Sequence, residues 1–532
     1  MPSSTLFARA LAERLHGPAA RDRTWVYVPY DQLHDGLGLF AGRDPHTLGV
    51  VLVENPARAA ARPYHQQKLA LVLANQRHFA LEQAARGVDV RYLVADGRGY
   101  AGALEDAARS LGPLAVHTPA ERGLRVELAP LMGTALREHP HTGWLTTRDQ
   151  FRRAAPEGPP WRMDAFYRLV RRETGVLMDG DRPRGGRFSH DGDNRQPYRG
   201  SPPLPRPPRF EPDPITVEVG DLIARRYAQH PGRVDLAALP ATLADAERLW
   251  RWALDACLPA FGPFEDAMTT RSSSLFHTRL APLLNLHRLL PARVLADVLA
   301  APLPLASQEG FVRQVLGWRE FVRHVHTETD GFRVLPDGVE ARDGAPSALG
   351  AARPLPPAYW GTASGLSCLD AVVADVWREA YTHHIPRLMV LGNLATLLDV
   401  SPRALTDWFW VAFADAYDWV VEPNVLGMAT WGAGDVMTTK PYIAGAAYLH
   451  KMGDYCGGCA FDPKRDCPVT PLYWAFLGRH AARLGHNQRM AVPLAALRKR
   501  PAAQRARDAA VFDVVAARLA AGRPVVPGDL PP

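Results

Sequence analysis

The chain has 532 residues, a length that predicts about three domains, or fewer if the domains are large. Hydrophobic residues make up 47% and charged residues 22%, which excludes a largely disordered chain, a coiled coil and a collagen-like polymer. The formal net charge of +7 permits a polyanionic partner, but over a surface of this size it is too weak a field to indicate one.

No window of about 18 residues is uninterruptedly apolar, so we expect no transmembrane span. Residues 1–23, interpreted as an N-terminal extension, lack the long apolar stretch of a secretory signal, and we therefore expect a cytoplasmic protein. The 5 cysteines are too few in a chain of this length to form a disulfide framework.

Residues 24–150 alternate between β-rich and helical patterns. Short β-rich runs at 24–28, 48–53 and 88–93 accompany a segment, 67–86, whose apolar residues recur at helical spacing. This alternation predicts an α/β domain with a doubly wound parallel sheet. No GxGxxG follows the first strand, so the classical dinucleotide fingerprint is missing, but a small ligand can still bind at the carboxyl edge of such a sheet.

Residues 151–237 are predicted to form an interdomain linker. The stretch 179–214 is rich in Pro, Gly and Arg and has no sustained apolar period, which favours an extended surface connection. The alternative is a basic loop that contacts phosphate groups.

Residues 238–523 carry patterns that are almost all helical, which predicts an all-α domain. Residues 330–357 interrupt it as a Gly-, Pro- and Ala-rich insertion, and the proline-rich tail 524–532 is expected to be disordered. The helical patterns span residues 243–260, 275–301, 309–324, 369–397, 402–416 and 472–484.

Four cysteines can meet at one centre. Cys456, Cys459 and Cys467 fall in YCGGCAFDPKRDCP, and Cys368 lies upstream in SGLSCLD. A CxxC pair with two further thiolates can hold tetrahedral zinc or an iron–sulfur cluster, and the spacing alone does not choose between them. Unliganded thiols are the third alternative. Cys257, in an apolar helical run, is interpreted as a core residue.

Aromatic and histidine side chains are concentrated in the helical half. We interpret most of its tryptophans as core, but Trp408 and Trp360 are candidates for passing electrons to a redox cofactor because an indole can be oxidised. The adjacent His383 and His384 offer groups that titrate near neutral pH. Consecutive helical residues point about 100° apart, so we do not expect both to line one site equally.

Two further patterns indicate a polar ligand. Arg387 and Asp415 lie in otherwise apolar helices, where burial of either charge alone is costly, so we expect an ion pair or a polar ligand there. The segment SLFHTRLAP, at 274–282, brings hydroxyl, imidazole and guanidinium donors to the start of a helix, where they can hold phosphate.

Several separate segments, in consistent order, match the pattern of a known family. They are YDQL at 30–33, MDAFYRLVRRETGVLM at 163–178, GWREFVR at 317–323, HHIPRLMVLGN at 383–393, FADAYDWVVEPNVLGM at 413–428, TKPY at 439–442 and the cysteines of YCGGC…CP. Together they resemble the iron–sulfur bacterial branch of the cryptochrome/photolyase family, which includes the prokaryotic (6-4) photolyases. The similarity covers nearly the whole chain.

The resemblance implies a Rossmann-like antenna domain followed by a helical domain that holds FAD. It also implies a [4Fe–4S] cluster on Cys368, Cys456, Cys459 and Cys467, and a guanidinium beside the flavin ring that would stabilise its reduced, anionic form. The residues that match the FAD site are His277, Thr278, Arg279, Trp318, Arg387, Asn393, Asp415 and Asn424.

Other residues match further roles of the family. The antenna expected by resemblance is 6,7-dimethyl-8-ribityllumazine. The matching residues are His384 and His383 for catalysis, Tyr442 and Met428 near the lesion pocket, Trp408 and Trp360 for electron transfer, and Asp31 and Glu54 for the antenna.

The implied activity is light-driven repair of UV-damaged DNA, above all of (6-4) photoproducts, by a monomeric enzyme. The excited, reduced flavin gives an electron to the lesion, and His384 gives a proton. Arg168, Arg171, Arg172 and the loop 182–195 are expected to hold DNA phosphates. The alternatives are a blue-light receptor with the same cofactors, and an iron–sulfur nucleic-acid-binding protein without flavin chemistry.

Two departures from the family pattern bear on these roles. Phe409 follows Trp408 at a position where relatives carry an oxidisable tyrosine. Tyr30 replaces the usual glycine at the antenna site.

Overall fold

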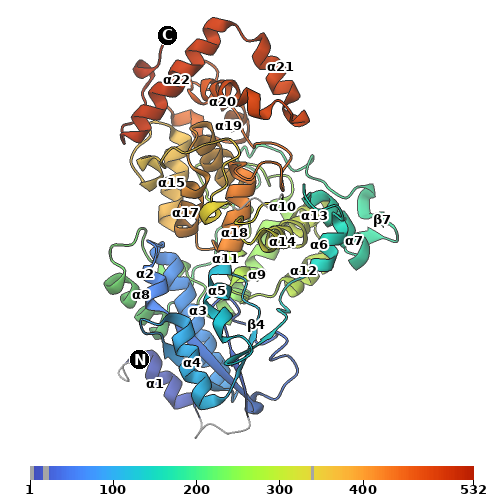
Figure 1. Ribbon diagram of the computed structural model, residues 1–532, viewed down its shortest axis with the longest axis vertical. Helices are drawn as coiled ribbons and strands as arrows, with labels where there is room; N and C mark the ends of the chain where they lie inside the picture. The colour runs from blue at the N-terminus through green and yellow to red at the C-terminus, as the bar shows by residue number, and fades with distance from the viewer. Residues whose placement is uncertain (1–4, 16–22, 337–340) are drawn as a thin grey trace.

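A computed structural model of the chain describes residues 5–15, 23–336 and 341–532. Figure 1 shows an α/β part that contains the N-terminus at one end of the molecule, and helices near the C-terminus at the opposite end. The predicted order, an α/β domain followed by helices, is confirmed. Parts of the expected N-terminal extension and of the insertion 330–357 lie outside the described residues.

Five parallel strands form the sheet, in the order β3-β2-β1-β4-β5. The chain adds β2 and β3 on one side of β1 and then crosses back to add β4 and β5 on the other side. The topological switch therefore lies between β1 and β4, where α/β sheets bind ligands at their carboxyl edge. The strands are β1 Thr24–Tyr27, β2 Leu48–Glu54, β3 Asp89–Val94, β4 Leu114–His117 and β5 Leu136–His139.

Both faces of the sheet are covered, as the doubly wound prediction requires. Val50 and Leu52 pack on one face in a core that includes Phe79, whereas Val51 and Val53 pack on the other face with Leu104 and its neighbours. Residues of a strand alternate between faces, so a strand buried on both sides is apolar throughout. The helices here are α1 Leu6–Arg14, α2 Pro56–Ala60, α3 Gln66–Ala85, α4 Gly99–Leu111 and α5 Arg122–Leu128.

The segment 151–237 is not a free surface linker. It carries α7 Met163–Thr174 and α8 Pro214–Arg226, and α8 packs along α3. A short hairpin of β6 Met178–Asp179 and β7 Arg182–Pro183 follows α7. The proline-rich stretch beyond it is extended, as predicted, but its aromatic rings Tyr198 and Phe210 are buried, because they pack against the helical part.

The helical part departs from the sequence prediction at two interruptions. Leu275 and Arg279 have positive φ of 48° and 57°, so the helix expected over 275–301 begins only at α11, Ala281–Asn285. Ala380, with φ of 51°, ends α15 after Glu379, and the chain is not helical again until His384.

The other helices have the following bounds. They are α6 Arg148–Ala154, α9 Leu243–Trp252, α10 Leu258–Phe261, α12 Pro291–Ala300, α13 Leu305–Val312, α14 Glu320–Glu328, α15 Ser367–Glu379, α16 Asn393–Leu397, α17 Pro402–Ala412, α18 Asp418–Val421, α19 Ala446–Met452, α20 Val469–Leu484, α21 Ala491–Lys499 and α22 Ala502–Ala520.

The C-terminal tail is ordered, which corrects the expectation of disorder. The Val525 side chain is fully buried, and its N–H donates to the Ser364 carbonyl at 2.9 Å. Asp529 forms an ion pair with Arg518 at 2.9 Å. Arg518 and Arg507 also donate to the carbonyls of Pro524 and Pro532, at 2.8 and 2.9 Å. These contacts order a segment whose composition predicts no core. Within the described residues, no helix is long and apolar enough to cross a membrane.

His287 connects the sheet to the helical part. Its Nδ1 lies 2.7 Å from the carbonyl oxygen of Asp31, just beyond β1, and its ring centroid lies 4.7 Å from that of His141. Burial lowers the pKa of His287 to about 3, with a further contribution from the nearby Arg319 guanidinium. The imidazole is therefore neutral in the folded protein at neutral pH.

We expect the stability of the protein to fall with acidification partly through His287. In the unfolded chain its pKa is about 6.5, so below that pH the unfolded state binds a proton that the folded state does not bind. The free energy of unfolding then falls by about 1.4 kcal/mol per pH unit for this group, down to about pH 3. Urea unfolding between pH 6 and 4 should show a shallower pH dependence for His287→Gln than for the natural protein.

The matched control is His450→Gln, because the His450 side chain is exposed. This control should keep the pH dependence of the natural protein. An unchanged slope in His287→Gln would contradict the assignment.

Candidate functional site

A large cavity, of ≈ 930 Å³, lies between the proline-rich stretch after β7 and the helical part. Its wall is rich in hydroxyl and guanidinium groups, which are donors suited to an anion such as a diphosphate. The polar members of this wall include Arg206, Arg209, Thr270, Arg271, Ser272, Ser273, Ser274, Arg279, Arg378 and Glu379.

Arg279 contacts several other residues of this polar wall. Its Nη1 donates to Ser274 Oγ at 2.9 Å and to Glu379 Oε2 at 2.7 Å, and its guanidinium lies 4.5 Å from the centroid of the Tyr381 ring. Arg279 has a positive φ and lies in the non-helical segment before α11. The structure thus brings Arg279 to the cavity, as expected for a phosphate-binding group.

Arg387 and Asp415 form the predicted ion pair. Arg387 donates two hydrogen bonds, at 2.9 and 3.0 Å, to the two carboxylate oxygens of Asp415, and its Nε donates to the Thr382 carbonyl at 2.7 Å. The guanidinium also lies 4.1 Å from the centroid of the Phe413 ring. Ala414, beside Asp415, lines the large cavity, so the ion pair lies next to that cavity.

Three histidines gather beside this ion pair. The His277 and His383 rings stack at 4.2 Å, and the centroid of the His384 ring is 5.2 Å from that of His277. His383 and His384 both reach this cluster, contrary to the expectation from helical geometry, because His383 precedes the helix that begins at His384. Among the residues that the structure describes, neither ring nitrogen of His383 has a hydrogen-bond partner, and its side chain is buried.

The three imidazoles are neutral at neutral pH. Burial lowers the pKa of His277, to about 3, and that of His383. The His384 side chain is 42% exposed, and its pKa is lowered by partial burial and by the positive charges of Arg313 and Arg387. Burial has the opposite effect on the Asp266 carboxyl, whose pKa it raises to about 7. Asp266 Oδ1 lies 3.9 Å from His384 Nε2, so a carboxyl that titrates near neutral pH adjoins the imidazole.

The four predicted cysteines line one small cavity, together with Tyr455. Burial raises the pKa of the Cys467 thiol to about 12 and that of Cys368 further, and the neighbouring cysteines add to the shift. Among the described residues, only the three imidazoles form a group of three ligand atoms that all lie within 4.8 Å. The sulfurs are therefore spread more widely than the about 3.8 Å that a tetrahedral zinc site with Zn–S near 2.3 Å requires.

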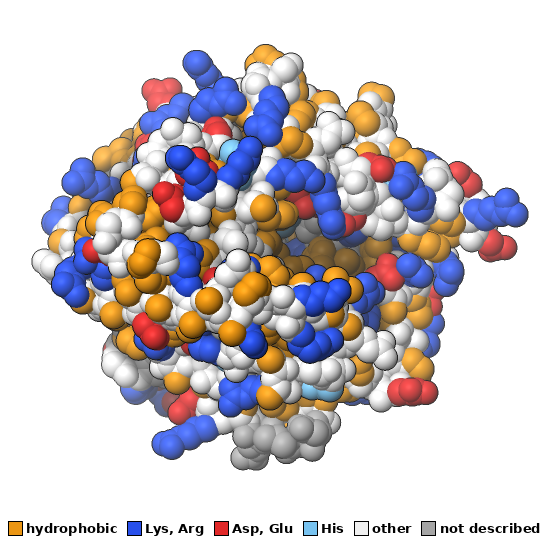
Figure 2. Space-filling view, turned by 90° about the horizontal axis from the view of Figure 1, so that it is seen from above, with side chains coloured by type: hydrophobic (Ala, Val, Ile, Leu, Met, Phe, Trp, Pro, Cys, Tyr) orange, Lys and Arg blue, Asp and Glu red, His pale blue; other side chains and the backbone are white. Residues whose placement is uncertain are grey.

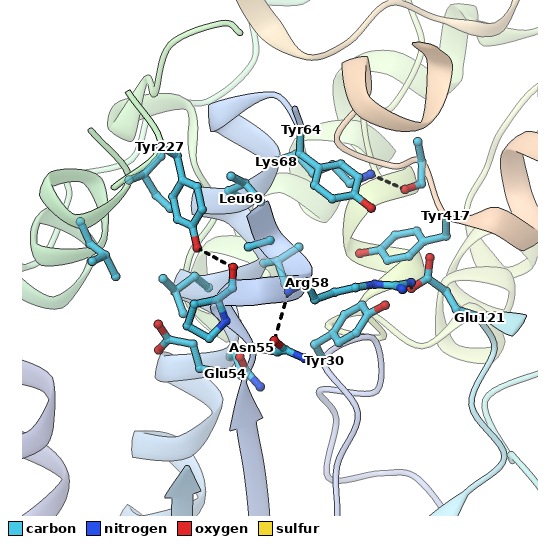
Figure 3. A pocket seen from close by; sticks show the side chains of 18 of the residues that line it. Tyr30, Glu54, Asn55, Arg58, Tyr64, Lys68, Leu69, Glu121, Tyr227 and Tyr417 are labelled. Carbon is cyan, nitrogen blue, oxygen red and sulfur yellow. Dashed lines mark hydrogen bonds and ion pairs between the residues drawn. The ribbon is translucent and has the colours of Figure 1, made fainter. Parts of the chain in front are cut away.

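A second cavity, of ≈ 110 Å³, lies at the carboxyl edge of the sheet (Figure 3). Its lining includes Tyr30, which follows β1, Glu54, at the end of β2, and the buried Lys68 of α3. The Tyr30 ring is nearly parallel to that of Tyr417 at 6.4 Å and occupies part of this edge. Of the two expected antenna residues, only Glu54 lines the cavity, whereas Asp31 is buried beside it.

The remaining expected cofactor residues lie outside the wall of the large cavity. Both polar atoms of the Asn393 amide bond the backbone of Ala444, at 3.0 and 2.9 Å. The Asn424 amide donates to the Val420 carbonyl at 2.8 Å, and Trp318 packs edge-on against Phe321. Thr278 is buried next to His277 and likewise does not line the cavity.

The two other expected catalytic residues are partly buried. Met428 packs against the large apolar core of the helical part. Burial raises the pKa of Tyr442, and the negative charge of Asp191 adds to the shift, which indicates that Tyr442 lies near this acid.

Two residues that contact the expected functional residues are not singled out by the sequence. Asp266 is one acid among many in the sequence, and only its packing beside His384 distinguishes it. Trp377 contacts both expected electron-transfer residues, Trp408 and Trp360, but its helical context is typical of a core residue.

We expect Asp415→Asn to lower the free energy of unfolding by about 3 kcal/mol, because it leaves the Arg387 charge partly buried without a carboxylate. Urea unfolding measures the loss. Asp407→Asn is the matched control: its carboxylate pairs with Arg62 and Arg403 but is 38% exposed. There we expect a change of less than about 1 kcal/mol. Equal losses in the two variants would contradict a structural role for the buried pair.

The chain is similar to several known proteins. A family model described as deoxyribodipyrimidine photo-lyase-related protein matches residues 26–238. A (6-4) photolyase of Agrobacterium fabrum (strain C58 / ATCC 33970) is 35% identical over 492 residues, which cover 88% of this chain and 94% of that protein. An uncharacterized protein of Acanthamoeba polyphaga mimivirus is 35% identical over 66 residues, 12% of this chain and 54% of that protein.

A solved structure shares the fold. The crystal structure of a bacterial class III photolyase from Agrobacterium tumefaciens aligns with 94% of this chain and 98% of its own, with a TM-score of 0.51 and 15% sequence identity. At this identity the likeness shows the architecture of the chain, an α/β part followed by a helical part.

Proposed function

This chain belongs to the photolyase family, and from that premise we propose that it repairs (6-4) pyrimidine photoproducts in DNA under blue light, with FAD as its cofactor. The observation that carries the proposal is the cluster of three neutral histidines beside the Arg387–Asp415 pair, at the edge of a cavity large enough for a dinucleotide. This arrangement offers proton donors and a fixed positive charge next to one ligand.

The large cavity is the FAD site in this proposal. Arg279 and the hydroxyls of Ser272, Ser273 and Ser274 hold the diphosphate, because they present donors along one wall. Arg387 holds its charge beside the ring system, fixed by both oxygens of Asp415. When bound, FAD supplies the light-driven electron.

The histidines supply the protons in this proposal. His384 can pass a proton to the lesion from one ring nitrogen as its Nε2 takes a proton from the Asp266 carboxyl, so that the ring stays neutral. The stacked His277 and His383 form the wall beside it. Asp266, with a pKa raised to about 7, is placed to return a proton to His384. The His383 ring, which has no hydrogen-bond partner within the described part of the chain, remains available to the substrate.

The cysteine cavity holds a [4Fe–4S] cluster in this proposal. Four thiols from α15 and from the loop before α20 converge on it, and the wide spread of the sulfurs favours a cluster over a single zinc ion. One wall is apolar, with Leu366, Leu449 and Val469, whereas Cys456, Cys459 and Cys467 are partly exposed.

The cavity at the sheet edge holds the lumazine antenna in this proposal. Tyr30, Tyr64, Tyr100 and Tyr417 give it aromatic walls suited to a flat ring. The segment 414–417 separates this cavity from the large one, since Ala414 lines the large cavity and Tyr417 the other. Light energy absorbed by an antenna in the sheet-edge cavity would therefore cross only a short distance to a flavin in the large cavity.

Damaged DNA, bound by a monomer in the cytoplasm, is the proposed partner. Figure 2 shows a hollow on one face of the molecule with Lys and Arg side chains around it. Arg168 and Arg172 stack near the Phe188 ring at the surface and can reach phosphates. Arg171 cannot, because it is fully buried and donates to the carbonyls of residues 176, 177 and 188. A damaged base step is easier to flip out than an intact one.

The test of the proposal is repair of a synthetic (6-4) oligonucleotide under blue light. We expect His384→Ala to lower the repair rate by about 100-fold or more, because loss of a positioned proton donor costs this much. The exposed His450→Ala is the control and should repair like the natural protein.

Two outcomes would contradict the proposal. Normal repair by His384→Ala would remove the assigned role. No repair by the natural protein with fully reduced flavin would instead favour the blue-light receptor, which shares the cofactors.

The cluster assignment is tested by metal analysis of protein purified without oxygen. We expect iron in the natural protein and loss of most iron in Cys456→Ser, because the cluster loses a thiolate ligand. Cys257→Ser is the matched control, since Cys257 is buried elsewhere and should leave the iron content unchanged. Zinc in place of iron would overturn the assignment.

A further inference from the structure

Three tryptophan rings form a continuous contact from the core to the surface. Trp408, on α17, is almost fully buried, at 1% exposure, whereas Trp360 is 47% exposed. Trp377, on α15, contacts both: its ring centroid lies 5.9 Å from that of Trp408, edge to face, and 5.5 Å from that of Trp360, nearly parallel at 18°.

Two of these rings donate hydrogen bonds to the same backbone carbonyl. The indole N–H groups of Trp408 and Trp377 both donate to the carbonyl of Tyr359, each at 3.0 Å. This oxygen carries a partial negative charge and therefore stabilises positive charge on either indole. The imidazole of His65 stacks on Trp377 at 5.8 Å and is neutral, since burial lowers its pKa to about 4. No cationic imidazole opposes charge on Trp377.

Among the described residues, three other aromatic rings contact Trp408 but do not suit this role. Phe409 and Phe413 lie 5.3 and 5.9 Å away, and an unsubstituted benzene ring is much harder to oxidise than an indole. Tyr359 also lies 5.3 Å away, but oxidation of a phenol requires loss of its proton. Its hydroxyl is buried and donates to the Leu391 carbonyl, which is not a base. Trp377 is therefore the best-placed electron donor next to Trp408.

We propose that Trp377 is the middle residue of an electron path that runs from Trp360 at the surface to Trp408 in the core. The proposal rests on the proposed flavin chemistry. Trp408 gives one electron to the light-excited flavin and becomes a radical cation, Trp377 then reduces Trp408, and Trp360 reduces Trp377. Each step moves one electron inward and leaves the oxidised ring one place nearer to the surface.

The exposure of Trp360 completes the path. The oxidised indole at the surface loses its N–H proton to water and becomes a neutral radical. A soluble thiol then gives it one electron and one proton, which restores the indole and leaves a thiyl radical. The flavin keeps the electron because the oxidised site has moved away from it.

The test measures photoreduction of the flavin in the holoprotein, under blue light, without oxygen and with a thiol present. We expect Trp377→Phe to slow photoreduction by about tenfold or more. Trp360→Phe should cause a similar loss, and the double variant should lose little more, because residues on one path are not additive. Trp474→Phe is the control, since Trp474 packs on Tyr473 and is remote from the path in sequence and contacts.

A second measurement does not depend on turnover. Time-resolved electron paramagnetic resonance after a light flash should show a long-lived indole radical in the natural protein and a short-lived one in Trp377→Phe. Flavin content and thermal melting of each variant show whether it is folded and loaded. Should Trp377→Phe melt or lose flavin, Trp360→Phe, at an exposed position, gives the same test.

The outcomes separate this proposal from the proposed function. Natural photoreduction and a natural radical lifetime in loaded Trp377→Phe would overturn the electron path alone. Enzyme reduced chemically beforehand should repair normally with either tryptophan replaced, because it no longer needs the path. A protein without flavin absorbance would instead overturn the proposed function.

Discussion

The partly buried pair of Arg387 and Asp415 is the interaction on which the geometry of the site depends. A guanidinium next to apolar helices is tolerated only when its donors are satisfied, and here Asp415 and the Thr382 carbonyl take its hydrogen bonds. The pair joins the segment after α15 to the segment after α17. It therefore fixes, side by side, the two stretches that border the large cavity.

The interruptions of helices matter as much as the helices themselves. A regular helix from 369 to 397 would turn His383 and His384 to different faces. The break at Ala380 releases His383 from this constraint, so that it stacks on His277. The break before α11 has the same effect on Arg279, which reaches the cavity from a non-helical position. The polar groups of the site thus come from places where the backbone leaves the helix.

Electrostatics divide the site into neutral and charged regions. His277 and His383 are neutral at neutral pH because they are buried, whereas the Arg387 guanidinium is accompanied by the Asp415 carboxylate. Arg171 also differs from the surface arginines in its surroundings: it is buried, and its N–H groups donate to backbone carbonyls. Charge at the sequence level is thus no guide to which arginines can meet DNA.

Much of the architecture follows from the sequence. The apolar runs of β1 and β2 and the helical spacing of α3 indicated a parallel sheet, because a strand covered on both faces has to be apolar throughout. The cysteine spacing indicated a shared centre, since CxxC holds two sulfurs close together. The expectation that the proline-rich tail is disordered was wrong, because composition cannot show that Val525 is buried by residues far away in the chain.

What the sequence alone determined is the order of the elements, the candidate ligands and the family they resemble, because these depend on local periodicity and motif. Only the tertiary structure decided that His383 and His384 share one cluster, that Asp266 adjoins it, and that Trp377 lies between Trp408 and Trp360. These contacts join residues whose separation along the chain carries no signal, and packing of the helices alone brings them together.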